Sequence, residues 1–383
     1  MAQKTSQFFG KSFDEGTLTK LELFKLYATE WFSTLVVSNV PNIKQLTIYD
    51  FFAGQGSDSN HHDGSPIIIC DVINKFLTSG HSGINKNLKI TVKCSDAEEE
   101  NVKNLKNLIL QKNYSGFDVV VEHSDFVSAF TKNVDNLASK NEASLVFLDQ
   151  FGIKDVNANM FEKIVNCPNT DFIMFVSSNF LKRFWENEAI YQYFPHLKEE
   201  DIACFRETPP YLIHRCALEK IYKPLVGERK YYLAPFSIRK KSNVYGLIFG
   251  SAHILGLQKF QKSCWNISPD FGDANFNIDN DFNVDADMTL FYNASKSEKI
   301  LDFEKKLTSF IKSREYVTNY DVLLFGLKAG FSIKKIQEAL ISINESLKLE
   351  LGGLDGYKPT NKTFGITEKT YQQKKLSYIK ISQ

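Results

Sequence analysis

A carboxylate followed by two closely spaced glycines is the part of the sequence best suited to hold a ligand. The run Leu46-Thr-Ile-Tyr-Asp50 is apolar up to its final acid, and Phe-Phe-Ala-Gly54-Gln-Gly56 follows it. The apolar run predicts a buried strand, and the glycines predict a tight turn at its carboxyl end. Because glycine has no Cβ, a ligand can approach the backbone closely at Gly54 and Gly56. Asp50 would then accept hydrogen bonds from that ligand.

The residues after this turn favour a cationic ligand over a diphosphate. A dinucleotide fingerprint needs a third glycine where this chain has Ser59. Asp58 and Asp63 precede the next expected helix, so a diphosphate would meet carboxylates where it needs a bare helix N-terminus. The acid, the aromatic residues and Gly-x-Gly together resemble the S-adenosylmethionine turn of class I methyltransferases. An ordinary strand-to-helix corner of an α/β domain is the alternative.

This resemblance implies roles for acids that follow the later expected strands. Asp96, with Glu98 as the alternative, would bind the ribose hydroxyls, and Asp125 would meet the adenine amino group. A helix N-cap is the alternative role for Asp125. After the fourth strand, Asp149 would orient or deprotonate the nucleophile, and Phe151 would stack on a flipped base.

Strands and helices alternate through the first half of the chain. Apolar runs predict strands over 46–50, 87–96, 117–121, 143–148 and 171–176. The segments between them predict helices, which implies right-handed crossovers and a doubly wound, mostly parallel, Rossmann-like sheet. A β-hairpin over 231–251 would add antiparallel strands, as in class I methyltransferases. Ligands bind such sheets where the strand order reverses, so Asp50 and Asp149 are expected to converge.

The sequence divides into four expected segments. They are an N-terminal helical cover over 1–45, a methyltransferase-like domain over 46–267 with an insertion at 183–229, a connection over 268–299, and a winged-helix-like domain over 300–383. The insertion mixes arginines, Arg183 among them, with aromatic residues that could stack on bases; a small satellite core is the alternative. In the last segment, Lys334 and Lys335 are candidate phosphate contacts, and a solvated helical face is the alternative.

Composition restricts the possible functions. The formal charge of +1 over 383 residues excludes a uniformly basic nucleic-acid binder, so such binding must rest on a local patch. The six scattered cysteines form no CxxC pair, which predicts reduced core thiols in a cytoplasmic protein. The absence of a signal peptide and of long apolar runs predicts no membrane partner. The acids between Asp279 and Asp285 resemble a calcium loop, but Val284 and Leu290 replace its required residues, so we expect no metal.

Taken in order, these pieces resemble a bacterial family, the three-Cys-motif partner proteins. The matching segments are Phe8 to Lys11, Asp50 to Gly56, Asp63 to Pro66, Phe147 to Gly152, Ser177 to Leu181 with Arg183, and 231–265 with Trp265. The family looks like class I methyltransferases and is usually encoded beside a phage-related protein with a three-cysteine, radical-enzyme-like motif, which is the implied partner. The family usually has proline after both acids, where this chain has Phe51 and Gln150.

Three functional hypotheses follow. The first is an S-adenosylmethionine-dependent methyltransferase acting on nucleic acid in a phage-related or defence locus, whose main task is to align an in-line displacement. The second is a non-catalytic methyltransferase-like partner or scaffold of the neighbouring three-cysteine-motif protein. The third, a dinucleotide oxidoreductase, is disfavoured by the missing third glycine. Gln150 lacks the rigidity of proline, which weighs more against amine methylation than against cofactor binding.

Overall fold

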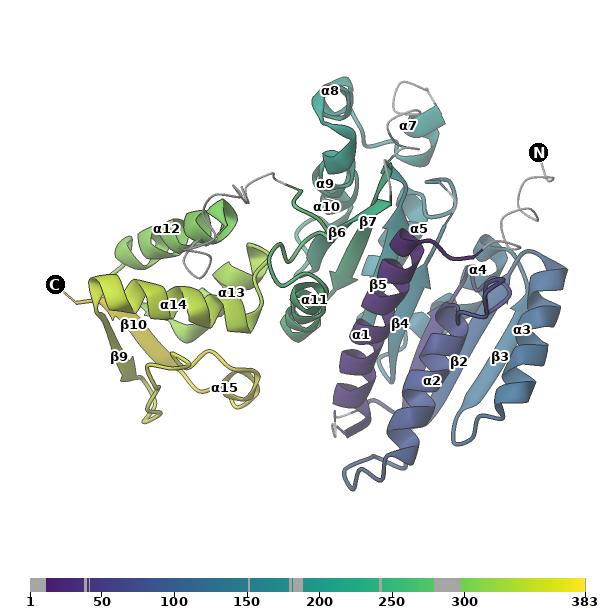
Figure 1. Ribbon diagram of the computed structural model, residues 1–383, viewed down its shortest axis with the longest axis horizontal. Coiled ribbons are helices and arrows are strands. Elements are labelled where there is room, and N and C mark those ends of the chain that lie inside the picture. Colours follow the sequence, from purple (N-terminus) through teal and green to yellow (C-terminus); the bar gives the residue numbers. More distant parts are fainter. Residues whose placement is uncertain are drawn as a thin grey trace. The chain divides into compact units, whose positions relative to one another are not determined.

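The chain consists of two compact units. The computed structural model describes residues 12–37, 40, 42–150, 152–178, 181, 189–240, 243–278 and 297–382. Unit 1 is Met1–Lys259 and unit 2 is Phe260–Gln383, and each is described by itself (Figure 1). The division falls inside helix α11 (Ile254–Ile267), whereas the sequence boundary was expected at 267. No helix of the described residues is long and apolar enough to span a membrane.

Unit 1 is built on a seven-stranded sheet in the order β3-β2-β1-β4-β5-β7-β6. Five neighbouring strands are parallel: β1 (Gln45–Asp50), β2 (Lys89–Asp96), β3 (Asp118–His123), β4 (Glu142–Leu148) and β5 (Thr170–Val176). β7 (Asn243–Ser251) runs antiparallel to β5 and to β6 (Tyr232–Lys240). The predicted doubly wound sheet is therefore confirmed, and its terminal antiparallel hairpin is that of the class I methyltransferase, Rossmann-like fold.

The strand order reverses between β1 and β4, which are adjacent. Every residue of β4 is buried, because the strand has neighbours on both edges and is covered on both faces. Asp50 lies in register with Cys94 of β2 and Phe147 of β4. The acids that end or follow these three strands therefore lie at the same edge of the sheet.

Helices cover both faces of this sheet (Figure 1). The parallel strands are connected by α2 (Ser65–Thr78), α3 (Glu99–Lys112), α4 (Phe126–Leu137) and α5 (Ala158–Val165). Helix α1 (Glu15–Val37) precedes β1 and packs against α2 and β6, as the predicted cover. Three polar contacts fix it in place: Lys20 with Asp149, the Tyr27 hydroxyl donating to Asp171 at 2.6 Å, and Lys259 with Glu30 at 3.4 Å.

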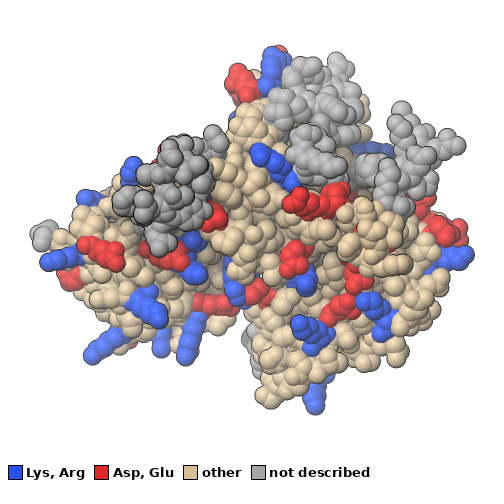
Figure 2. All heavy atoms as spheres, viewed as in Figure 1, with Lys and Arg blue, Asp and Glu red and all other residues tan. Residues whose placement is uncertain are grey.

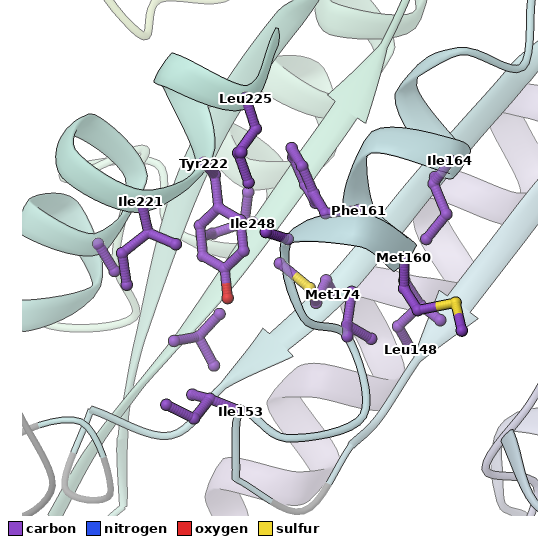
Figure 3. Close-up of a cluster of buried hydrophobic side chains, with 14 of the residues drawn as sticks. Leu148, Ile153, Met160, Phe161, Ile164, Met174, Ile221, Tyr222, Leu225 and Ile248 are labelled. Atoms are coloured by element: carbon purple, nitrogen blue, oxygen red, sulfur yellow. The ribbon is translucent and has the colours of Figure 1, made fainter. Parts of the chain in front are cut away.

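The described part of the predicted insertion packs onto the main core of unit 1. Its short helices are α7 (Ala189–Tyr193), α8 (Glu199–Glu207), η2 (Pro210–Leu212), α9 (Ile213–Ala217), η3 (Leu218–Tyr222) and α10 (Lys223–Val226). Figure 3 shows Tyr222 and Leu225 facing Phe161 of α5, and the Tyr222 and Phe161 rings are 4.9 Å apart. Tyr222 is fully buried, as are Phe194 and Phe205, so these rings are core residues and unavailable for stacking on bases.

The described residues of unit 2 after α11 form the helices α12, α13 and α14 and a small antiparallel sheet in the order β8-β10-β9. Its elements after α11 are α12 (Glu298–Lys312), β8 (Val317–Thr318), α13 (Asn319–Lys328), α14 (Ile333–Leu347), β9 (Leu349–Gly353), α15 (Glu368–Gln372) and β10 (Ser377–Ile381). Trp265 stacks on Phe331 at 5.5 Å and donates its indole N–H to the Gly330 carbonyl at 2.9 Å. The three helices expected in this region are confirmed.

Substitution of Gly56 by alanine should destabilise unit 1 by about 3 kcal/mol, the sum of a backbone and a packing cost. Gly56 has φ +87°, and an added Cβ would lie 2.7 Å from Leu105 Cδ1. Gly80 has φ +75° but no atom within 4 Å of its Cβ position, so Gly80→Ala should cost only about 1 kcal/mol. Urea unfolding of both variants measures the difference, and equal losses would exclude the contact with Leu105.

Candidate cofactor and active site

Asp50 is a buried carboxylate with one unused oxygen. Its side chain is at the end of β1, and the residue is 1% exposed. Oδ1 accepts the Phe52 N–H at 3.3 Å, whereas Oδ2 is buried without a hydrogen-bond partner among the described residues. The pKa of Asp50 is raised to about 7, chiefly by burial; Ser65 and the Phe52 N–H oppose the rise, and the nearby Asp149 and Asp96 add a smaller upward effect. A buried polar atom without a partner costs stability, so this site suits a ligand that brings a cationic donor.

Asp96 ties the glycine turn to β2. Its Oδ2 accepts the Gly54 N–H at 2.8 Å, and its Oδ1 accepts the Glu98 N–H and the Asn101 side-chain amide, both at 2.9 Å. A carboxylate has about four acceptor positions, so these three bonds leave room for a ligand hydroxyl. Glu98, the alternative ribose ligand, supplies its backbone N–H to Asp96 here.

The two glycines serve different purposes. Both have left-handed backbone conformations, with φ +62° at Gly54 and +87° at Gly56, which confirms the predicted turn. At Gly56 the space for a side chain is already filled by Leu105 and Leu108 of α3 and by Ile67 of α2. The absence of a Cβ at Gly56 therefore lets the turn pack on two helices. Close approach of a ligand to the backbone is still expected at Gly54.

Asp58 organises the loop between the turn and α2. The residue is 4% exposed and accepts N–H groups from Phe13 at 2.6 Å, Asn60 at 2.9 Å and His62 at 2.8 Å. Burial acts to raise the pKa of Asp58, but these bonds and the His62 ring lower it to about 2. The sequence suggested Asp58 as a carboxylate that would repel a diphosphate, and the structure uses it to hold this loop. The Asp50 side chain, beside Ser65 at the start of α2, is the group that disfavours a diphosphate there.

Asp149 forms an ion pair that sequence reasoning missed. The Lys20 ammonium of α1 contacts Asp149 Oδ2 and lies 5.2 Å from the centre of the Phe175 ring. The Lys20 side chain is 11% exposed and that of Asp149 is 32% exposed. In the sequence, Lys20 is one polar residue of an amphipathic helix. It lies 129 residues before Asp149, so no local pattern links the two. This contact places a cation directly against the Asp149 carboxylate.

The turn after Asp149 is held without proline. Gln150 is buried, and its side-chain oxygen accepts the Val156 N–H at 3.0 Å, which joins the two ends of the segment that follows β4. This bond restrains a turn that has no proline after Asp149. Phe151, the expected stacking residue, lies outside the described residues.

Asp125 is the N-cap of α4, as its alternative interpretation predicted. Oδ1 accepts the Ser128 N–H at 3.0 Å, and Oδ2 accepts the Ser128 hydroxyl at 2.8 Å. The Ser128 bonds hold the pKa of this exposed carboxyl below its ordinary value. Asp96 and Asp149 both raise the pKa of Asp50, and Asp96 is joined to the turn after β1 by the Gly54 N–H. The structure therefore brings Asp50, Asp96 and Asp149 together and places Asp125 in a cap.

The candidate nucleic-acid contacts are less free than expected. Lys334 and Lys335 both pair with Glu338, at 4.0 and 3.3 Å, and Lys335 also lies 5.0 Å from the centre of the Trp265 ring. Arg183 and the calcium-loop-like acids between Asp279 and Asp285 lie outside the described residues. In the described part of the chain, no group of three or more His, Cys, Asp or Glu side chains could hold a metal ion.

Comparison with known proteins gives only distant structural similarity. No family model and no curated protein matches the chain. Solved structures similar to it include Trm1 from Pyrococcus horikoshii, in complex with S-adenosyl-L-methionine, at 11% identity and TM-score 0.32, with 61% of this chain and 55% of Trm1 covered. An O-methyltransferase from Bacillus cereus, in complex with SAH, has 12% identity and TM-score 0.32, with 61% and 80% covered. An rRNA methylase from Streptococcus thermophilus has 10% identity and TM-score 0.28, with 55% and 87% covered. Support for a function therefore comes from the strand order and the site residues.

Asp50→Asn should make unit 1 more stable at high pH than at low pH, relative to wild type. The folded pKa near 7 exceeds the ordinary value of 3.8, so the folded state binds more protons between these values and wild-type stability falls as pH rises. The loss is complete above pH 7 and amounts to at most about 4 kcal/mol. The substituted asparagine does not titrate, so the variant should gain on wild type between pH 5 and pH 8 in thermal unfolding.

Asp125→Asn is the matched control, because the folded pKa of Asp125 is lowered. The stability that Asp125 contributes is gained as pH rises from the lowered folded pKa to the ordinary 3.8 and is complete above it, so this variant should run parallel to wild type between pH 5 and pH 8. Parallel curves for wild type and Asp50→Asn would show that Asp50 is not held in a desolvated site.

Proposed function

We propose that the chain is an S-adenosylmethionine-dependent methyltransferase that acts on nucleic acid. The observation that carries this proposal is the unpartnered oxygen of buried Asp50 at the point where the strand order reverses, with Asp96 and Asp149 close by. Three carboxylates and one lysine favour a cation, and the donor's ammonium would supply the hydrogen bond that Asp50 lacks. When bound, the sulfonium supplies a methyl group activated for in-line displacement.

The chain's own residues would bind and align the reactants. Asp50 binds the ammonium, the Gly54 turn and Asp96 hold the ribose, and Asp125 keeps acceptor positions for the adenine amino group beside its cap bonds. Asp149, positioned by its contact with Lys20, faces the substrate and accepts hydrogens of an amine to orient it. Phe151 stacks on the base.

The ion pair also favours the second hypothesis, a non-catalytic scaffold for a neighbouring three-cysteine-motif protein in a phage-related or defence locus. Lys20 satisfies Asp149 without any substrate, so the arrangement is stable as a structural contact. The helix–strand–helix–helix–strand–helix–strand order of unit 2 from α12 to β10 and its β8-β10-β9 sheet support a winged helix, which could serve either function. Arg183 remains a candidate nucleic-acid contact, whereas Lys334 and Lys335, the other two that the sequence suggested, both pair with Glu338.

Asp149→Asn should leave the affinity for S-adenosylhomocysteine within about twofold and reduce methyl transfer by about 100-fold or more, because Asp149 is proposed to face the substrate and not the adenosyl group. Calorimetry measures binding, and a labelled methyl donor with mixed DNA and RNA measures transfer. Asp118→Asn is the control, since Asp118 begins β3 at the opposite edge of the sheet. Wild-type transfer by Asp149→Asn would disprove the assigned role. Cofactor binding without transfer in wild type would favour the scaffold.

Lys20→Met should reduce methyl transfer by about tenfold, because removing the ammonium leaves the Asp149 side chain without the contact that fixes its position. Lys20→Arg keeps a cationic donor at this position and should transfer at close to the wild-type rate. Thermal unfolding of both variants checks that α1 remains packed. Transfer at the wild-type rate by Lys20→Met would reduce Lys20 to a structural contact.

A further inference from the structure

The segment 354–376 between β9 and β10, here called the basic loop, carries an excess of exposed positive charge. It contains five lysines and two acids, and Lys358, Lys362, Lys369 and Lys374 are exposed. The lysine ion pairs in the described part of unit 2 are made by other residues, among them Lys299, Lys306, Lys334, Lys335 and Lys380. In Figure 2 basic side chains gather along the lower edge of the part that Figure 1 colours yellow, with few acids among them.

The backbone of the basic loop is held at several points. Asn319, 3% exposed at the start of α13, donates to the carbonyls of Gly365 at 2.9 Å and Lys375 at 3.0 Å. Gln337 of α14 donates to the Ile366 carbonyl at 2.7 Å, and the Phe364 side chain is fully buried. The loop therefore presents its lysines from a fixed backbone, so binding a partner would order little more than their side chains.

The outward face of α14 is poorly suited to the same partner. Its exposed residues are Lys334, Glu338, Ile341, Glu345 and Ser346, and Glu338 pairs with both Lys334 and Lys335. Two carboxylates and an isoleucine would face the phosphates beside a single exposed lysine if this helix entered a groove. Like charges across an interface disfavour binding.

We propose that the basic loop, and not helix α14, is the surface of unit 2 that binds the phosphate backbone of nucleic acid. The proposal rests on the proposed nucleic-acid substrate and names the surface that would hold it. Lysine is depleted in protein–protein interfaces but binds phosphate as a point charge. The loop contains no arginine, the residue that most often reads guanine bidentately, so binding should be independent of sequence.

The test uses the full-length chain and a labelled mixed-sequence duplex of about 20 base pairs, without methyl donor, across a salt series. Replacing Lys358, Lys362, Lys369 and Lys374 together by Gln should weaken binding at least about tenfold at about 0.1 M salt and reduce the salt slope by up to about 3.6, since each lost phosphate contact contributes about 0.9. The control replaces Lys305, Lys306, Lys312 and Lys328, four exposed lysines of α12 and α13, by Gln and should change affinity less than about twofold. Lys334→Gln should likewise bind as wild type.

Three results would overturn the proposal. They are equal weakening in both fourfold variants, no weakening in the loop variant, and competition by polyglutamate or phosphatidylglycerol vesicles as strong as by unlabelled duplex. Calorimetry with S-adenosylhomocysteine separates this test from the proposed function, because the loop variant should keep wild-type cofactor affinity. If the wild-type chain binds duplex but not S-adenosylhomocysteine, the result supports the basic loop and contradicts the proposed methyltransferase. If it binds S-adenosylhomocysteine but not duplex, the result supports the cofactor site and contradicts the basic loop.

Discussion

The burial of the Asp50 carboxylate is the constraint on which the ligand edge of unit 1 depends. Asp50 lies where β1 and β4 are adjacent and the strand order reverses, so it cannot reach solvent. One oxygen is used by Phe52, the other has no partner among the described residues, and two more carboxylates are nearby. Such a group lowers stability. A fold that keeps it there is consistent with a cationic ligand supplying the missing bond.

Helix α1 balances part of this negative charge. It crosses from the carboxyl edge of the sheet, where Lys20 meets Asp149, toward the start of β5, where Tyr27 donates to Asp171. Burial raises the pKa of Asp171 to about 6 against the opposing bonds of Ser251 and Tyr27, and burial likewise raises the pKa of Tyr27. The helix that covers the sheet thus also supplies the cation that contacts Asp149, the residue proposed to face the substrate.

In unit 2, the order of the helices and strands and the distribution of exposed charge point to different surfaces for phosphate contact. The element order resembles that of a winged helix, in which the second helix of the pair commonly enters a groove. Here that helix presents acids and pairs its lysines internally, while the loop between the last two strands presents exposed lysines on a restrained backbone. The same order of elements can therefore use a different surface for phosphate contact.

The sequence by itself determined the order of the elements, the doubly wound sheet and its hairpin, the turn at Gly54 and Gly56, and the convergence of Asp50 with Asp149. These follow from local periodicity, from glycine's conformational freedom and from the rule that parallel strands share their carboxyl edge. Only the tertiary structure decided the pairing of Lys20 with Asp149, the use of Asp58 to fix a loop, the packing of Gly56 on Leu105 and the engagement of Lys335 with Trp265. Each of these joins residues far apart in the chain or depends on which neighbour fills a space. In the sequence, a charged residue or a glycine is compatible with many neighbours. The packing of the folded chain determines which neighbour it contacts.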